Sequence, residues 1–245
     1  MLAGCNIILT FVSSKYHNMD NDYLKISDDG RVVLGFNELE EPFCDLIIPD
    51  GIEEIGPKAF DGCSFLLQVV LPNSLKVIHE QAFNYTGLQC VEIPEGVEII
   101  GLGAFGNTRS LTHISLPNSL RIIETGAFGA SALKSIYIPE GVTTIGLGAF
   151  FNSVDLVCAS IPSTVKKMCD PFVNPALRFI HMHHKDLSDV EIFMNVHSEN
   201  CLLFVPYGTK DLYQQHPDIR GFQYIIEENY DSYFWKNVRQ FLYGI

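Results

Sequence analysis

Apolar residues recur at fixed positions through the middle of the chain, in a phrase of 22 or 23 residues. The phrase is easiest to follow from its prolines, whose spacing alternates between the two lengths: Pro49, Pro72, Pro94, Pro117, Pro139 and Pro162. A period in this range with fixed apolar positions is typical of a solenoid, in which each coil buries its apolar face only against its neighbours. The pattern therefore predicts one elongated repeat domain.

Each repeat begins with a short strand that ends at its proline, because proline cannot donate a hydrogen bond to a strand ladder. Copy four reads Leu-x-x-Ile-x-Leu over 111–116, with inward residues two apart, as the pleat of a strand requires. Copies of this strand are expected to stack about 4.8 Å apart into a parallel sheet with two inward ladders. The ladders are Leu46, Val69, Val91, Ile114 and Ile136, and then Ile48, Leu71, Ile93, Leu116, Ile138 and Ile161.

The second half of each repeat is expected to return to the core and close the coil. Residues predicted to point inward there are Leu75, Val97, Leu120 and Val142, followed by Ile78, Ile100, Ile123 and Ile145. Ala-Phe pairs at 59–60, 82–83, 104–105, 127–128 and 149–150 then close the coil, because the small residue lets backbones approach while the ring fills the space beside it.

Alternate copies are more alike than adjacent ones. Odd copies carry Asp-Gly or Glu-Gly after the proline, whereas the second and fourth carry Asn-Ser. Residues 71–115 and 116–160 share 23 identities in 45 positions, so the duplicated unit is interpreted as two coils. The one-residue difference in spacing lies between the Ala-Phe pair and the next strand, where a loop is expected to absorb it.

The phrase Ile-Pro-x-Gly-Val-x-x-Ile-Gly-x-x-Ala-Phe, at 93–105 and 138–150, resembles the BspA-like class of leucine-rich repeat proteins. The resemblance covers roughly 22–228, although the asparagine ladder of the commoner leucine-rich repeats is missing. It implies a mainly β fold: a right-handed leucine-rich-repeat solenoid with a parallel sheet along one face, an N-terminal hairpin cap and a C-terminal β/helix cap. It also implies a non-enzymatic binding protein at the cell surface or secreted.

We expect five segments along the chain. They are a leader of uncertain order at 1–21, a capping hairpin at 22–44, about six repeats at 45–176, a repeat-like C-terminal cap at 177–228, and an amphipathic helix at 229–245. Within the cap, Thr209 is placed to cap a short helix. The last helix is interpreted as a lid on the solenoid's end or as a partner-binding element, because its apolar residues have helical spacing.

Composition narrows the classes of partner and leaves the compartment open. A net charge of −13 and a pI near 4.9 argue against nucleic acid and anionic membranes, and the sequence predicts no membrane-spanning segment. Leu2–Cys5 resembles a lipoprotein box, but the apolar run follows it, so we interpret the match as chance and predict no signal peptide. The seven cysteines lack C-x-x-C spacing and are expected to be free, which suits a reducing compartment and conflicts with the family's usual location.

No catalytic motif is present, and the repeated Gly-x-Gly at 101–103 and 146–148 belongs to the coil, so we predict no enzyme activity and no cofactor. The histidines at 181, 183 and 184 could hold a metal, but too few further ligands lie nearby in sequence. Outward strand residues are expected to bind a protein or glycan: Gln68, Glu92, His113, Ser115, Ser135 and Tyr137. The alternative is a structural spacer or assembly unit that acts through its ends, with its oligomeric state left open.

Overall fold

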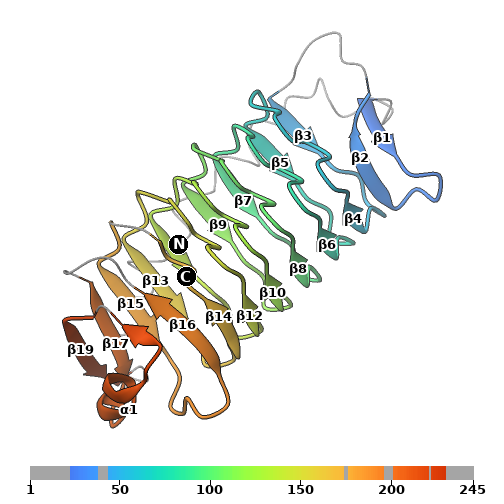
Figure 1. The fold of residues 1–245 in the computed structure, drawn as a ribbon. Coiled ribbons are helices and arrows are strands. Elements are labelled where there is room, and N and C mark those ends of the chain that lie inside the picture. The colour runs from blue at the N-terminus through green and yellow to red at the C-terminus, as the bar shows by residue number, and fades with distance from the viewer. Residues whose placement is uncertain (1–22, 38–43, 174–175, 196–200, 221, 230–245) are drawn as a thin grey trace.

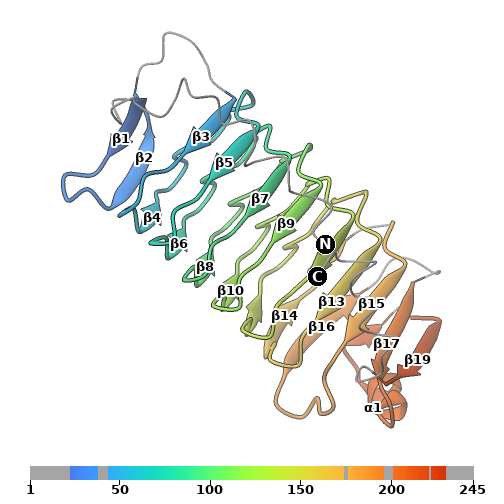
Figure 2. The same ribbon diagram turned by 180° about the vertical axis from the view of Figure 1, so that it is seen from behind.

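The computed structural model describes residues 23–37, 44–173, 176–195, 201–220 and 222–229. They form an elongated stack of coils, with a hairpin at one end and a short helix at the other (Figure 1). Seen from behind, the coils follow the same order along the axis (Figure 2). The expected leader at 1–21 and nearly all of the expected helix at 229–245 lie outside the described residues.

The first strand of each repeat ends before the repeat proline, as the sequence predicts, and in the first five repeats it ends two residues before it. Together these strands form the first row, which is divided into sheets of four and five parallel strands. The first sheet contains β3 (Asp45–Ile47), β5 (Gln68–Val70), β7 (Cys90–Glu92) and β9 (His113–Ser115). The second contains β11 (Ser135–Tyr137), β13 (Cys158–Ile161), β15 (Phe179–Met182), β17 (Leu202–Pro206) and β19 (Tyr224–Glu228).

A second row of short strands runs along another side of the coils and was not predicted. Its strands are β4 (Glu54–Ile55), β6 (Val77–Ile78), β8 (Ile99–Ile100), β10 (Ile122–Ile123), β12 (Thr144–Ile145), β14 (Lys167–Cys169), β16 (Glu191–Asn195) and β18 (Ile219–Arg220). These strands pair in parallel. The solenoid with a parallel sheet is therefore confirmed, and the structure adds a second sheet to it.

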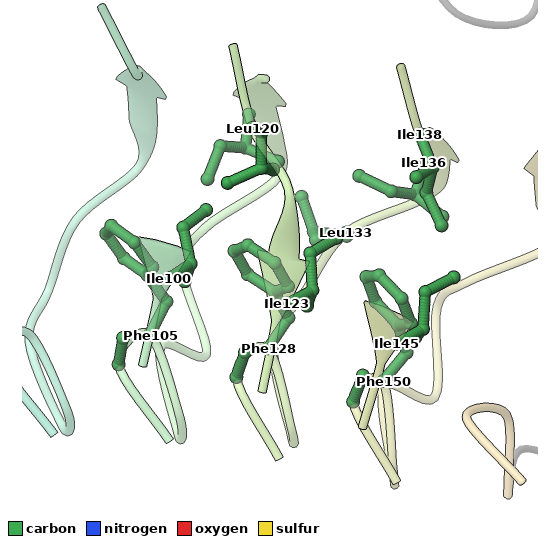
Figure 3. Close-up of a cluster of buried hydrophobic side chains, with 14 of the residues drawn as sticks. Ile100, Phe105, Leu120, Ile123, Phe128, Leu133, Ile136, Ile138, Ile145 and Phe150 are labelled. Carbon is green, nitrogen blue, oxygen red and sulfur yellow. The ribbon is translucent and has the colours of Figure 1, made fainter. Parts of the chain in front are cut away.

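A stack of phenylalanine rings fills the interior between the coils (Figure 3). Phe105 and Phe128 lie 5.6 Å apart between ring centroids and are inclined by 9°. The full stack is Phe60, Phe83, Phe105, Phe128, Phe150 and Phe172. Phe172 joins it although Asp170-Pro171-Phe172 lacks the expected alanine, because Phe150 donates its N–H to Pro171 where the earlier coils use that alanine.

Strand pairing in the first row follows the repeat length. Across the 23-residue steps, β3 with β5 and β7 with β9 each align three residue pairs. Across the 22-residue steps, β5 and β7 align one pair, and β9 and β11 belong to separate sheets. The expectation that a loop absorbs the shorter step is therefore incomplete, because the missing residue also loosens the strand pairing beside it.

The two ends are closed differently. At the N-terminal end, β1 (Leu24–Ile26) and β2 (Val32–Phe36) form an antiparallel hairpin, and β2 pairs with β4 of the second row. At the C-terminal end, α1 (Lys210–Gln215) packs against β17 and β19. Thr209 precedes this helix, but its hydroxyl donates to the Pro206 carbonyl and does not cap it. Glu227 instead accepts the N–H of Lys210 at 2.9 Å.

Candidate binding surface

The six predicted contact residues lie on the outward face of the first row, formed by the first and third residues of its strands. The middle residue of each of these strands is inward and buried: Val69, Val91, Ile114 and Ile136. Strand register places Cys90 beside His113 and Glu92 beside Ser115. Glu92 and Ser115 are exposed, whereas the four others, Gln68, His113, Ser135 and Tyr137, are half-buried.

Exposure of the outward face falls sharply at β13. On β13, Cys158 and Ser160 also point outward, yet they are only 3% and 2% exposed. On this strand, an outward position by strand alternation therefore does not make a residue accessible. Ser160 is a small residue between Tyr137 and His181 in register, and its Oγ lies 3.1 Å from His183 Nε2. The outward face is therefore accessible from β3 to β11 and closed at β13.

The expectation that all cysteines are free is wrong at Cys90, which is disulfide-bonded. Cysteines without C-x-x-C spacing can still pair when they lie far apart in sequence, and an odd cysteine count permits one pair. The described cysteines outside this bond are reduced: Cys44, Cys63, Cys158, Cys169 and Cys201. Because one cysteine is oxidised, the thiols no longer favour a reducing compartment.

The histidines at 181–184 have separate surroundings. The His181 ring stacks on Phe204 at 4.6 Å, and its Nδ1 lies 3.6 Å from Glu228 Oε2. His184 Nε2 lies 2.7 Å from the carbonyl oxygen of Val165. Burial lowers the pKa of His184, because the charged imidazolium loses hydration there. Among the described residues, no group of three histidine, cysteine or acidic side chains could hold a metal.

The second row has a different surface, with charges of alternating sign in successive coils. Glu53 lies 3.4 Å from Arg31 in the preceding element and 2.8 Å from Lys76 in the following coil. Farther along, Lys166 lies 3.2 Å from Asp189. Exposed ion pairs of this kind contribute little to stability, because solvent and salt screen them. These ion pairs neutralise part of the charge along the second row.

Within the described part of the chain, no helix has the length and apolar character needed to cross a membrane. Comparison with known proteins adds the family and the fold. No curated protein matches the chain. Among solved structures, the pneumococcal vaccine antigen PcpA matches at 19% identity with a TM-score of 0.52, over 76% of this chain and 68% of its own. At this identity the likeness shows the fold alone.

Two further bacterial structures match less closely. The T. pallidum leucine rich repeat protein TpLRR is 18% identical, with a TM-score of 0.48, over 86% of this chain and 100% of its own. A leucine rich cell surface protein from Faecalibacterium prausnitzii A2-165 is 16% identical, with a TM-score of 0.43, over 90% and 96%. The family described as the BspA type leucine rich repeat region matches residues 39–172 in 6 copies, which is more than half of the chain. With the coils, inward ladders and phenylalanine stack in place, this match shows that the chain belongs to the BspA-type leucine-rich repeat family.

Proposed function

We propose that this chain is a non-enzymatic module that binds a partner protein through the outward face of the first row. The observation that carries the proposal is the row of polar side chains that the strand register holds side by side, with exposed Glu92 next to exposed Ser115. A rigid, regular surface of varied side chains is how repeat proteins bind macromolecules. Gln68, His113, Ser135 and Tyr137 extend this surface on either side.

Charge indicates the kind of partner. Asp45 and Glu92 are exposed on the outward face, and Glu95 is exposed just beyond the proline that ends β7. The chain as a whole carries a net charge of −13. We therefore propose that the partner presents a basic patch, since charge complementarity speeds encounter and sets register. A protein partner is favoured over a glycan because Tyr137 is the only aromatic side chain among the outward residues from β3 to β11.

The test selects ligands from a displayed library of protein domains and, in parallel, from a glycan array. Ser115→Arg places a bulky cation on the outward face, and Thr143→Arg places the same side chain at an exposed position beside the second row as a matched control. We expect a protein ligand whose affinity falls about tenfold or more with Ser115→Arg, as at the centre of an interface, and is unchanged by Thr143→Arg. A ligand indifferent to Ser115→Arg contradicts the proposed surface, and binding to glycans alone contradicts the proposed class.

A second candidate is assembly through the C-terminal end. In the described residues β19 is the last strand of its sheet, so its outer edge has no pairing strand there. Tyr224 and Ile226 on this strand are exposed, and unpaired apolar edges invite pairing with another chain. Light scattering tests this idea: self-association at high concentration that is abolished by Ile226→Lys supports it, whereas a monomeric wild-type protein contradicts it.

A further inference from the structure

The residues that run from a second-row strand back to the next first-row strand form a further surface of each coil, which we call the return edge. It comprises 101–112 in the third coil, 124–134 in the fourth and 146–157 in the fifth. Four large apolar side chains on this edge are between 44% and 54% exposed: Leu102, Leu147, Phe151 and Val154. They belong neither to the buried core nor to the outward face. Exposed apolar side chains gathered in one region of a surface indicate a site of contact with another molecule.

The return edge is also electrically balanced in these three coils. Its charged residues are two basic ones, Arg109 and Lys134, and two acidic ones, Glu124 and Asp155. The chain as a whole carries a net charge of −13, so two copies repel each other over most of their surface. Their repulsion is weak where charges of both signs balance. The return edge is therefore suited to contact with a second copy of the same chain.

We propose that the return edge is the interface of a homodimer, in which two copies lie antiparallel with the third coil of each against the fifth coil of the other. A two-fold axis then crosses the fourth coil, and both copies contribute the same residues, as in an isologous dimer. This interface goes beyond the proposed function, because the outward face of the first row takes no part in it and stays available to a different partner.

The apolar residues are self-complementary in this arrangement. Residues of the third and fifth coils correspond at a spacing of 45, so the two-fold axis brings equivalent positions together. Leu102 of one copy meets Leu147 of the other, and both are exposed in the single chain. Phe151 meets Gly106, which has no side chain to keep the ring away. Burial of these side chains in the contact removes apolar surface from water, which favours association.

Short side chains occupy the centre of the interface, where each fourth coil meets its own copy. Four half-buried positions there are glycine or alanine: Gly126, Gly129, Ala130 and Ala132. Because none of these residues projects far from the backbone, the two chains can approach closely enough for the larger apolar side chains on either side to touch.

Opposite charges meet beside the apolar contacts. Arg109 of one copy lies against Val154 and its neighbour Asp155 of the other, and the two-fold axis makes this contact twice. Within the described part of the chain neither Arg109 nor Asp155 forms an ion pair, so both are available to a second copy. Like charges meet at the margins, where Glu124 and Lys134 each face the same residue of the other copy and the solvent screens their repulsion. Charge complementarity of this kind fixes the register of the two copies.

The mass of the full-length chain in solution tests the interface. A contact limited to three coils belongs to the small, transient class, so we expect a dissociation constant on the order of 100 µM, measured by sedimentation equilibrium up to about 500 µM. Leu102→Lys should raise this constant about tenfold or more, as near the centre of an interface. Leu34→Lys is the matched control, since Leu34 on β2 is also a leucine that is 44% exposed, and it should leave the constant unchanged. A wild-type chain that stays monomeric, or a dimer indifferent to Leu102→Lys, overturns the proposal.

Charge reversal tests the antiparallel arrangement separately. It changes only exposed polar positions, so it does not depend on whether an apolar variant folds. Arg109→Asp and Asp155→Arg should each weaken the dimer about tenfold or more, because each brings two pairs of like charges together. Mixing the two variants should restore association, because both contacts in the mixed dimer again join opposite charges. A mixture that associates no better than either variant alone overturns this arrangement.

Two further substitutions separate this interface from folding and from assembly through β19. Phe151→Ala should weaken the dimer and leave the stability of the dilute, monomeric chain nearly unchanged, because Phe151 is 52% exposed in the single chain. Association that is abolished by Ile226→Lys and unaffected by Leu102→Lys overturns the return edge as the interface. The ligand test with Ser115→Arg involves none of these residues, so the failure of the dimer and the failure of the proposed function are distinguishable.

Discussion

Ser119 accepts the backbone N–H of Gly96 with its Oγ at 2.9 Å, and so ties the fourth coil to the third. The same hydroxyl donates to the carbonyl oxygen of Val97 at 2.8 Å. Gly96 has a φ of +105°, a conformation that suits glycine and leaves its N–H pointing at the next coil. The Asn-Ser coil is therefore the hydrogen-bonding complement of the Glu-Gly coil before it, which explains why the chain repeats in pairs of coils.

Ser119→Ala should lower the free energy of unfolding by about 1–2 kcal/mol, because it leaves a partly buried donor and acceptor without their partner. Urea unfolding followed by circular dichroism measures the change. Ser163→Ala is the matched control, since the Ser163 hydroxyl only meets Glu140, at 3.4 Å on the surface. Equal stability of Ser119→Ala and Ser163→Ala would contradict a structural role for the hydroxyl.

The residue that follows the second-row strand also alternates between coils: it is Gly101 in the third coil and Glu124 in the fourth. A Cβ added to Gly101 would lie 2.8 Å from the backbone nitrogen of Glu80, closer than real Cβ atoms approach. Gly101→Ala should therefore destabilise the protein by about 1–3 kcal/mol through overpacking against a backbone that cannot move aside. Glu124→Ala, at the equivalent position of the following coil, is the control and should change stability by about 0.5 kcal/mol or less. Calorimetric melting of both variants measures the difference in stability. A Gly101→Ala variant as stable as the wild-type protein would contradict close packing of the coils at this position.

Adjacent phenylalanines test the ring stack. Phe150 is fully buried between Phe128 and Phe172, at 5.4 Å from each ring, whereas Phe151 is 52% exposed. Phe150→Ala should cost about 3–5 kcal/mol, and Phe151→Ala should stay within about 0.5 kcal/mol. Phe150→Leu keeps most of the volume and remains measurable if the alanine variant does not fold. Similar losses at positions 150 and 151 in chemical denaturation would contradict the stack as the main source of coil cohesion.

The coil interior could be predicted from the sequence because the same apolar positions recur in every copy of the repeat. The Ala-Phe pairs predicted a ladder of phenylalanine side chains, and Phe105 and Phe128 are stacked in the structure. Phe172 was missed as a member, because it stands one residue before the position that the repeat spacing predicts. Pro171 nevertheless supplies the backbone acceptor that alanine supplies in the earlier coils. Two-residue strands of the second row were missed as well, because such short segments carry no period-two alternation to detect.

The outward face was harder to predict, since it is determined by contacts that repeat spacing does not encode. Strand alternation correctly assigned Ser160 to the outward side, but alternation cannot tell which outward residues are covered. The bond at Cys90 was missed because the absence of C-x-x-C spacing does not exclude pairing between cysteines far apart in sequence. The residues proposed as binding contacts therefore remain a prediction that Ser115→Arg tests.

His184 makes stability depend on pH. It is buried, and its pKa lies below the value of 6.5 because burial penalises the imidazolium. In the unfolded chain the ring takes up a proton as the pH falls through 6.5, while in the folded protein it stays neutral to lower pH. Protons therefore favour the unfolded state, so this contribution to stability is full above pH 6.5 and is lost progressively as the pH falls below it.

We expect the free energy of unfolding to decrease between pH 7.5 and 5.5, with a contribution from His184 of up to about 1.4 kcal/mol per pH unit. His184→Gln should reduce this slope, because glutamine keeps an N–H near the Val165 carbonyl and does not titrate. Tyr213→Phe is the control: it removes the 3.0 Å hydrogen bond from the Tyr213 hydroxyl to the carbonyl oxygen of His184 and leaves the imidazole in place. That variant should lose about 1 kcal/mol at every pH and keep the wild-type slope. Urea unfolding across this range separates the two effects, and an unchanged slope in His184→Gln would assign the pH dependence to other groups.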